Sequence, residues 1–256
     1  MSDDKRIESI LNTLMSLARL DFDSRIPASD KNDALEAIAT GVNMLGEELR
    51  ENAFSLKEKE TLIKELHHRV KNNMQIIISL LKLQADQLEN QQLIKLVKAS
   101  QSRISAMALV HEMLYNTDNF VFTNFKTYVE FLASGLLMSH SKSTENIKLE
   151  LDINEDIFFE IDAMIPLGLM LNEMISNSLL HAFDDSGGVI SVHANLEEDG
   201  WYVIKVVDNG TGFPDGFQFK KSKQLGTQLI AMLSEQLDAQ LEVKSSKGVH
   251  YNMKFM

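Results

Sequence analysis

Residues 34 to 115 contain no proline, and this long stretch limits what the first half of the chain can form. The 256-residue chain has only three prolines, Pro27, Pro166 and Pro214. Because proline breaks helix interiors, its absence here permits long helices. Apolar residues recur every seven positions, with two more at the second seam position: Leu49, Leu56, Ile63, Val70 and Ile77, then Leu66 and Leu80. This pattern predicts a helix packed against partner helices in a bundle or coiled coil.

A second helical pattern follows a polar break at residues 89–92. Positions from Leu93 to Leu114 repeat with spacings of three and four, which predicts a helix folding back antiparallel to the first. The two helices are expected at 50–90 and 93–115. Because two such helices per chain bury their apolar faces in a four-helix bundle, we predict a homodimer.

The first 50 residues predict a shorter helical module. A helix from Ile7 to Leu20, a connector, and a helix from Asp33 to Leu49 account for the pattern. The connector string Asp-Phe-Asp-Ser-Arg-Ile and the later Gly-Val-Asn-Met-Leu, which begins at Gly41, resemble a HAMP-type signalling module. A plain helical hairpin that extends the dimer explains the same helices equally well.

From about residue 120 the pattern changes to short β-like runs mixed with helices. A helix is expected from Pro166, because proline favours the first turn, to Leu179, and another after Gly226. The end of the chain, around Gly248, predicts a hairpin. The β-like runs are Phe120–Thr123, Ile147–Ile153, Val189–Ala194, Tyr202–Val207, Leu241–Val243 and His250–Phe255. The sequence therefore predicts a separate α/β domain.

Composition argues against several classes of partner. The formal net charge of -12 opposes general binding to nucleic acid or anionic membranes, since no basic patch offsets it. With no cysteine, the chain forms neither disulfides nor thiolate metal sites, which fits a reducing compartment. The most apolar runs fall well short of the roughly 18 residues that span a bilayer. We therefore expect a soluble, cytoplasmic protein without a membrane span.

Two adjacent histidines lie on the first long helix, in the string Glu-Leu-His-His-Arg-Val that begins at Glu65. With Ile63 and Val70 on the seam, His68 faces away from it and His67 lies on its flank. A neutral imidazole nitrogen is a nucleophile towards a γ-phosphoryl group, and an exposed position lets an ATP domain and an acceptor protein reach it. The alternative is a pair of solvated surface histidines.

Three polar side chains recur at every fourth residue of an otherwise apolar helix, Glu173, Asn177 and His181. This spacing puts them on one face. The Asn177 amide oxygen suits Mg²⁺ bound to nucleotide phosphates, and Glu173 suits the ordering of water or a proton near the reacting phosphate. A surface stripe of an amphipathic helix is the alternative.

A carboxylate and two glycines follow a β-like run in the string Val-Val-Asp-Asn-Gly-Thr-Gly, which begins at Val206. Asp208, at the end of a buried strand, can accept a hydrogen bond from an adenine amino group. Gly210 and Gly212 let the backbone approach the base closely. A plain hairpin turn is the alternative, since Asp-Asn-Gly is ordinary turn chemistry.

A fourth segment places Gly226 and Thr227 where a glycine precedes an amphipathic helix. The N-terminus of such a helix receives phosphate through free amides and its dipole. The preceding residues 215–223 carry three lysines and have the composition of a mobile lid over phosphates. The same lysines, Lys220, Lys221 and Lys223, also fit plain solvated charges.

The order and spacing of these four segments resemble the sensor histidine kinases, in which a histidine-bearing helical hairpin precedes a Bergerat-type ATP-binding domain. The resemblance covers about residues 55 to 256, and a phosphoacceptor histidine followed by arginine is similar to a subgroup related to the HWE kinases. It implies that His68 is the phosphoacceptor, Asn177 the Mg²⁺ ligand and Asp208 the adenine-binding carboxylate. Further site residues implied by the resemblance are Glu173, His181, Gly210, Gly212, Lys221, Gly226 and Thr227.

The sequence departs from the commonest family pattern in three places. Arg69 follows the histidine where an acidic residue is common, and a guanidinium cannot act as a base. Leu180 stands where a basic residue is usual. The second glycine box has a single glycine and the last is reduced to Lys247 and Gly248, so the lid lysines are expected to hold phosphate.

The predicted fold is multidomain, α and α+β, with a helical-hairpin dimerisation bundle followed by a Bergerat-type α/β sandwich. The expected domains are 1–50, 51–118 and 119–256, with a hinge at 115–124. The predicted function is autophosphorylation of His68 from Mg²⁺ and ATP, then transfer to an aspartate of a response regulator. The alternatives are a Bergerat-fold ATPase or serine kinase with another acceptor, and a degenerate scaffold that docks receiver domains.

Overall fold

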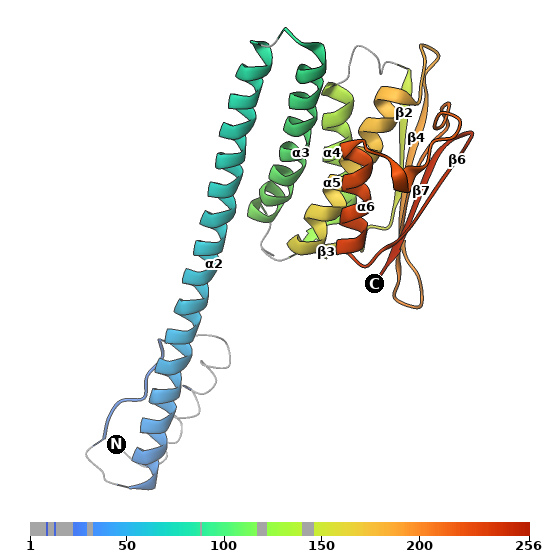
Figure 1. The fold of residues 1–256 in the computed structure, drawn as a ribbon. Helices are drawn as coiled ribbons and strands as arrows, with labels where there is room; N and C mark the ends of the chain where they lie inside the picture. Colours follow the sequence, from blue (N-terminus) through green and yellow to red (C-terminus); the bar gives the residue numbers. More distant parts are fainter. Residues whose placement is uncertain are drawn as a thin grey trace. The chain divides into compact units, whose positions relative to one another are not determined.

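The computed structural model describes residues 9, 13, 23–29, 33–87, 89–116, 122–139 and 146–256. Within it the chain forms two compact units, Met1–Ile63 and Lys64–Met256. The second unit contains a helical hairpin and a set of α/β layers (Figure 1). Most of the helix predicted at Ile7–Leu20 lies outside the described residues, as does the start of the predicted connector.

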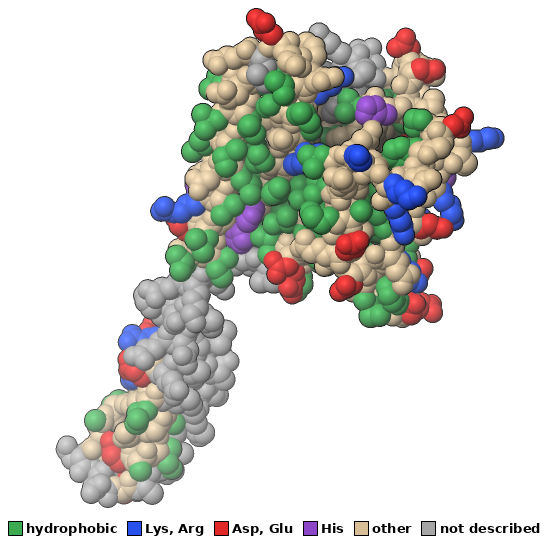
Figure 2. All heavy atoms as spheres, viewed as in Figure 1, with side chains coloured by type: hydrophobic (Ala, Val, Ile, Leu, Met, Phe, Trp, Pro, Cys, Tyr) green, Lys and Arg blue, Asp and Glu red, His purple; other side chains and the backbone are tan. Residues whose placement is uncertain are grey.

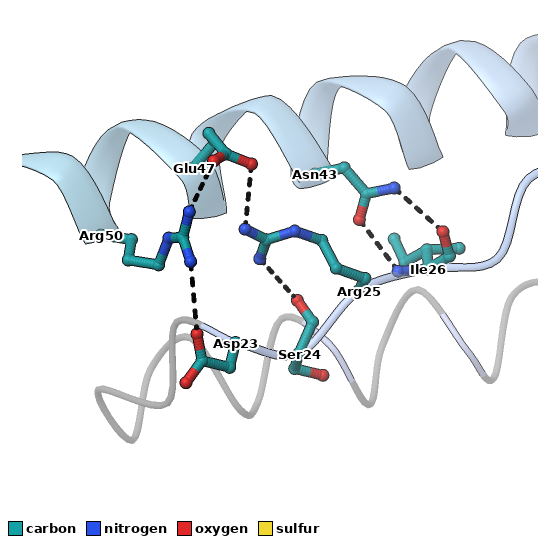
Figure 3. Close-up of polar contacts among 7 residues, drawn as sticks. All are labelled: Asp23, Ser24, Arg25, Ile26, Asn43, Glu47 and Arg50. Atoms are coloured by element: carbon teal, nitrogen blue, oxygen red, sulfur yellow. Dashed lines mark hydrogen bonds and ion pairs between the residues drawn. The ribbon is translucent and has the colours of Figure 1, made fainter.

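In the first unit, the described part of the connector runs beside the start of a long helix, α2 (Ala34–Asp86). The Asn43 side chain accepts a hydrogen bond from the Ile26 amide and donates one to the Ile26 carbonyl, both at 2.9 Å (Figure 3). Glu47 accepts from Arg25 at 3.1 Å and from Arg50 at 3.0 Å. These contacts fix the position of the connector along α2.

The predicted helical hairpin is present. Helix α2 ends at Asp86, and α3 (Gln91–Asn116) follows a short turn. The Asn90 side chain caps α3 by accepting a hydrogen bond from the Gln92 amide at 2.9 Å. The helix expected to start near residue 50 is instead continuous from residue 34, because no proline interrupts it.

Apolar side chains of the predicted seam are exposed on the hairpin (Figure 2). Leu66 is 54% exposed and Leu80 is 57% exposed, so neither is covered within one chain. The side chains of Leu49 and Leu56 lie outside the described set. Further large apolar residues exposed on α2 and α3 are Leu62, Ile63, Ile76, Ile77, Leu83, Leu93, Leu96 and Tyr115.

The rest of the second unit is a two-layer α/β structure. Its five-stranded sheet has the order β2-β4-β5-β7-β6, with β2 and β4 parallel and the other neighbours antiparallel. Helices α4, α5 and α6 cover one side of this sheet (Figure 1), and β1 pairs with β3 in a small second sheet. The elements are β1 (Phe122–Asn124), α4 (Phe125–Ser139), β2 (Ile147–Ile153), β3 (Phe158–Glu160), α5 (Ile161–His181), β4 (Gly188–Leu196), β5 (Tyr202–Asp208), the short 3₁₀ helix η1 (Phe219–Lys221), α6 (Leu225–Gln236), β6 (Gln240–Ser246) and β7 (Gly248–Phe255).

A single apolar core joins these layers to the second helix of the hairpin. Val110 and Leu114 of α3 are fully buried in the same cluster as Met174 of α5. The buried Tyr128 hydroxyl of α4 donates to the Ala106 carbonyl of α3 at 3.1 Å. Helix α3 is therefore docked against α4 and α5, so the hairpin and the α/β layers pack together.

The structure has the predicted strands and C-terminal hairpin, and it differs at three elements. Helix α5 begins at Ile161 rather than near Pro166, which lies in its second turn and costs only the hydrogen bond to the Asp162 carbonyl. Helix α4 and strand β3 were not predicted, although the buried residues of α4 recur at helical spacing from Phe125 to Leu136; β3 has only three residues. Among the helices that the structure describes, none has the length and apolar character to cross a membrane.

Candidate nucleotide site and phosphoacceptor

Helix α5 carries the predicted polar face from the interior out to the surface. Glu173 is only 6% exposed, Asn177 is half-buried and His181 is exposed. A solvated stripe on an amphipathic helix would expose all three, so the buried glutamate argues against that alternative. Burial of a carboxylate requires a partner, and this helix therefore holds a built polar site.

Asp208 is the last residue of β5 and is 2% exposed. One carboxylate oxygen, Oδ1, accepts hydrogen bonds from the amides of Gly210 at 3.0 Å and Val249 at 3.1 Å. The other oxygen, Oδ2, accepts from the Ser178 hydroxyl of α5 at 2.8 Å. These three donors fix the ionised carboxylate in one orientation. Oδ2 keeps a lone pair with which it can accept a further donor.

Glycines around Asp208 allow several backbone segments to meet. A Cβ at Gly210 would lie 2.2 Å from the Ala182 carbonyl oxygen, and one at Gly248 would lie 1.8 Å from the Asp208 carbonyl oxygen. Gly212 and Gly248 also have φ of +77° and +92°, values that favour glycine. The segment after β5 leaves the sheet towards η1 and α6, so the plain hairpin-turn alternative does not hold here.

Gly226 lies in the first turn of α6, directly beside the polar face of α5. A Cβ there would lie 2.5 Å from Glu173 Oε2 and 3.9 Å from Asn177 Nδ2. No side chain caps this helix start at Gln224, so its first amides point towards the site with their dipole. The Thr227 hydroxyl instead donates to the Gln224 carbonyl at 2.8 Å, within the helix start itself.

The predicted lid contains η1, and aromatic contacts hold it to the domain. The Phe219 ring lies 6.1 Å from the Tyr251 ring, in an edge-on arrangement. The rings of Phe213 and Phe217 pack at a tilt, with centroids 4.4 Å apart, in the segment that leads into it. Lys221 is exposed. This exposure fits either a side chain that extends to bind phosphate or a solvated surface charge.

The structure adds two site residues that the sequence analysis missed. Ser178 donates a hydrogen bond to Asp208, and Tyr251 of β7 is 2% exposed with its hydroxyl beside the Asn177 side chain. Burial raises the pKa of Tyr251, so its hydroxyl stays protonated. The only sequence signal for Ser178 was its place beside Asn177, and nothing marked the tyrosine in a hairpin strand.

His68 is exposed on α2, on the face predicted for it. Its ring lies 5.2 Å from the Tyr115 ring of α3, and Asn72 Nδ2 lies 3.4 Å from its Nδ1. The neighbouring His67 is turned inward, with Nδ1 3.0 Å from Nδ1 of His111. Of the two histidines, His68 is thus the more accessible, and among the described residues no carboxylate is hydrogen-bonded to it.

The structure brings six of the predicted residues into two connected groups. Glu173, Asn177 and Gly226 meet at the start of α6, and Asp208, Gly210 and Gly212 meet at the end of β5. Ser178 and Tyr251 join the two groups. Among the described residues, His181 and Lys221 are exposed and belong to neither group, and His68 belongs to the hairpin.

Glu173 also has an unpredicted partner in the hairpin. Arg103 of α3 donates from Nε to Oε1 at 2.9 Å and from its terminal nitrogen to Oε2 at 3.0 Å. The two side chains are 15% and 8% exposed, so this is a largely buried bidentate ion pair. The residues just before this pair, Ser102 on α3 and Asn172 on α5, are also in contact. The Ser102 hydroxyl donates a hydrogen bond to Asn172 Oδ1 at 2.7 Å.

Two protein families match the second unit in the order that the motifs suggested. Residues 65–140 match the family described as Histidine kinase (HisKA_2), and residues 163–255 match that described as Histidine kinase-, DNA gyrase B-, and HSP90-like ATPase. The first match includes His68, and the second includes the polar face of α5 and the end of β5. The chain therefore carries a histidine kinase hairpin module followed by an ATPase module.

Curated relatives carry the same description. The chain is 29% identical over 204 residues to the sensor histidine kinase PdtaS of Mycobacterium tuberculosis, covering 78% of this chain and 40% of that protein. It is 30% identical over 207 residues to PdtaS of Mycolicibacterium smegmatis, covering 79% of this chain and 39% of that protein. The chain thus spans about two fifths of the length of these relatives.

A solved structure shares the fold. The histidine kinase domain of the Erythrobacter litoralis EL346 blue-light activated histidine kinase superposes with a TM-score of 0.57 and 21% identity, covering 78% of this chain and 95% of that chain. Together with the two matching domains, this likeness identifies a helical region followed by the α/β sandwich of histidine kinase ATPase domains. The chain therefore carries a HisKA_2 histidine kinase domain followed by a histidine kinase-type ATPase domain, and the curated relatives that it matches are sensor histidine kinases.

Proposed function

We propose that this chain is a protein-histidine kinase that transfers the γ-phosphoryl group of ATP to His68. The observation that carries the proposal is the presence, in one unit, of an exposed histidine on a kinase-type hairpin and a polar ATPase site on α5, α6 and the end of β5. An ATPase without a histidine acceptor would not need this hairpin. The proposal assigns domains 1–50, 51–118 and 119–256 to signalling, dimerisation with phosphotransfer, and nucleotide binding.

The residues present fit a magnesium-bound nucleotide. Oxygen ligands are the ones that Mg²⁺ prefers, and the site offers the amide of Asn177 beside the carboxylate of Glu173. The close approach of Gly226 leaves no room for a Cβ, so the backbone of α6 itself lines the site. When bound, Mg²⁺ neutralises charge on the phosphates during transfer.

Each residue then has a separate role. Asp208 accepts from the adenine amino group, while Gly210 and Gly212 shape the base pocket. The first amides of α6, with Gly226 and Thr227, hold phosphate oxygens, and Lys221 and His181 contact the phosphates from the border. Asn177 holds the metal, and Glu173 orders water or accepts a proton near the transferred group.

Transfer to the imidazole rests mainly on positioning and charge neutralisation, as in other phosphoryl transfers. His68 attacks the γ-phosphorus of ATP with the lone pair of one ring nitrogen, the bond from that phosphorus to the β,γ-bridging oxygen breaks, ADP leaves, and the other ring nitrogen releases its proton to water. The phosphohistidine then passes its phosphoryl group to an aspartate of a response-regulator receiver domain, for which the exposed face around His68 leaves room.

The exposed apolar face of the hairpin supports a homodimer. Leu66 and Leu80, with their neighbours on α2 and α3, leave large apolar side chains in water that a second hairpin would bury. Two hairpins would form the predicted four-helix bundle. The proposal includes a cytoplasmic location, which the absence of cysteine fits, and no partnership with nucleic acid or membrane, since the net charge of -12 disfavours both.

The test is incubation of the chain with γ-labelled ATP and Mg²⁺, comparing the wild type with His68→Gln and the matched His67→Gln. Label should be lost in His68→Gln, kept in His67→Gln, and removed by mild acid, since phosphohistidine is acid-labile. Acid-stable label would indicate a serine kinase instead. Nucleotide binding without label in any variant would indicate a scaffold.

A further inference from the structure

The ion pair between Arg103 and Glu173 joins two parts that must move relative to each other. Arg103 belongs to the hairpin that carries the phosphoacceptor, and Glu173 belongs to the nucleotide site. Both carboxylate oxygens of Glu173 accept from the guanidinium, and Asn172 Nδ2 approaches Oε1 at 3.3 Å. A carboxylate held in this way has both of its oxygens engaged, so it is not available to order water or to receive a proton near the phosphates.

The same contact keeps the phosphoacceptor away from the nucleotide site. His68 lies beside Tyr115, whereas Arg103 lies twelve residues earlier on the same helix, which corresponds to about 18 Å along the helix axis. Reacting atoms must come within about 3.5 Å of each other for transfer. The docked arrangement therefore cannot be the one in which phosphoryl transfer occurs.

The surrounding contacts make this docked arrangement a defined state. Ser102 and Asn172 are hydrogen-bonded one residue away on each helix, and Val110 and Leu114 of α3 are fully buried in the common core. Breaking the ion pair while both groups stay buried would leave two unpaired charges. The pair is consequently either closed or opened by separating α3 from α5.

We propose that Arg103 and Glu173 form an autoinhibitory contact that holds the kinase in a resting state. Closed, it engages both oxygens of Glu173 and fixes the ATPase layers on α3 far from His68. Opened, it frees the Glu173 carboxylate and lets the nucleotide site travel towards the phosphoacceptor. This inference rests on the proposed kinase function for its consequence, although the contact itself can be measured without any catalysis.

The first experiment measures the contact directly. The chain has no cysteine, so Ser102→Cys with Asn172→Cys places one thiol on each helix, at positions whose side chains already touch. Disulfide formation under mild oxidant should be rapid, and adding Arg103→Gln should slow it at least about fivefold, the lower end of typical coupling between sites. The matched control Lys126→Gln, which removes an exposed ion pair with Glu155, should leave the rate unchanged. An unchanged rate with Arg103→Gln would refute the contact's holding role.

The second experiment measures the consequence. The oxidised double-cysteine chain should bind ATP but not label His68, and reduction should restore labelling. Arg103→Gln alone should raise the labelling rate at saturating ATP at least about fivefold with ATP affinity within about twofold. Full labelling of the oxidised chain, or loss of labelling in a folded Arg103→Gln chain, would overturn the inference. Absence of label in the reduced and wild-type chains alike would refute the kinase function instead, while the disulfide rates still decide whether Arg103 holds the contact.

Discussion

Replacing Asp208 with asparagine should separate nucleotide recognition from folding. Asparagine has the same shape as aspartate, and its oxygen can keep accepting from the amides of Gly210 and Val249. Its amide nitrogen then faces Ser178, whose hydroxyl can donate instead to the Met174 carbonyl, at 3.2 Å. The fold should therefore tolerate this change.

The expected effects on stability and on binding have separate causes. Asp208→Asn should cost about 1–3 kcal/mol of unfolding free energy, because the hydrogen bonds from Gly210 and Val249 lose their charged acceptor and the one from Ser178 is lost. An adenine amino group, by contrast, would meet a donor where it needs an acceptor. Losing a hydrogen bond to a charged group costs about 1.5–3 kcal/mol, which corresponds to roughly 10- to 150-fold weaker binding.

Two further variants complete the comparison. Asp208→Ala leaves the donors of Gly210, Val249 and Ser178 without an acceptor. Each donor that stays buried and unpaired costs about 1–3 kcal/mol of unfolding free energy, so alanine should lower stability much more than asparagine. Asp152→Asn, at a side chain that is 87% exposed, should change neither property. Calorimetric titration with ATP and urea denaturation measure the two effects. ATP binding by Asp208→Asn within about threefold of the wild type would refute the adenine-binding role.

Three other predictions follow from the same geometry. Gly226→Ala should lower phosphoryl transfer at least about tenfold, because its Cβ would lie 2.5 Å from Glu173 Oε2 and would push the α6 backbone away from the site; normal transfer would contradict a backbone-lined site. Gly168→Ala should destabilise the second unit by roughly 1–3 kcal/mol, since its Cβ would overlap the buried Tyr128 hydroxyl, and urea denaturation would show it. Burial and then the charge of His67 lower the pKa of His111 from its usual value near 6.5, so the unfolded chain binds more protons and stability should fall as pH drops below about 6.5. His111→Gln should flatten that pH profile, and an identical slope would assign it to other groups.

The sequence predicted helices and strands where the pattern was regular. The seven-residue repeat indicated the hairpin, and alternation gave β2, β4, β5 and the β6–β7 hairpin. The predicted start of α5 near Pro166 was wrong, since the helix begins at Ile161. A proline in the second turn is tolerated because only one carbonyl loses its hydrogen-bond partner. The four motif segments also indicated which residues would meet, since their family order implied a shared site.

The contacts that hold the site together could not be predicted from local pattern. Arg103 and Glu173 are 70 residues apart in sequence, and Ser178 and Asp208 are 30 apart. Neither pair follows a helical or strand spacing, so only the packing of α3 on α5, and of α5 on the sheet, brings them together. The same holds for Tyr251, whose position in a short strand gave no sign of a buried hydroxyl.

The structure narrows the choice of groups that could accept the proton released by His68. Arg69 Nε donates a hydrogen bond to Glu65 Oε1, one turn earlier on the helix, at 2.8 Å. These two side chains are therefore paired with each other and not with the imidazole. The polar neighbour that the structure provides is Asn72, whose amide nitrogen Nδ2 lies 3.4 Å from Nδ1 of His68, and an amide cannot act as a base. Because Nδ2 is a donor, this contact leaves the lone pair on Nδ1 and the ring proton on Nε2. Because the ring is exposed, water can take the ring proton after transfer, and a carboxylate next to the histidine is not required.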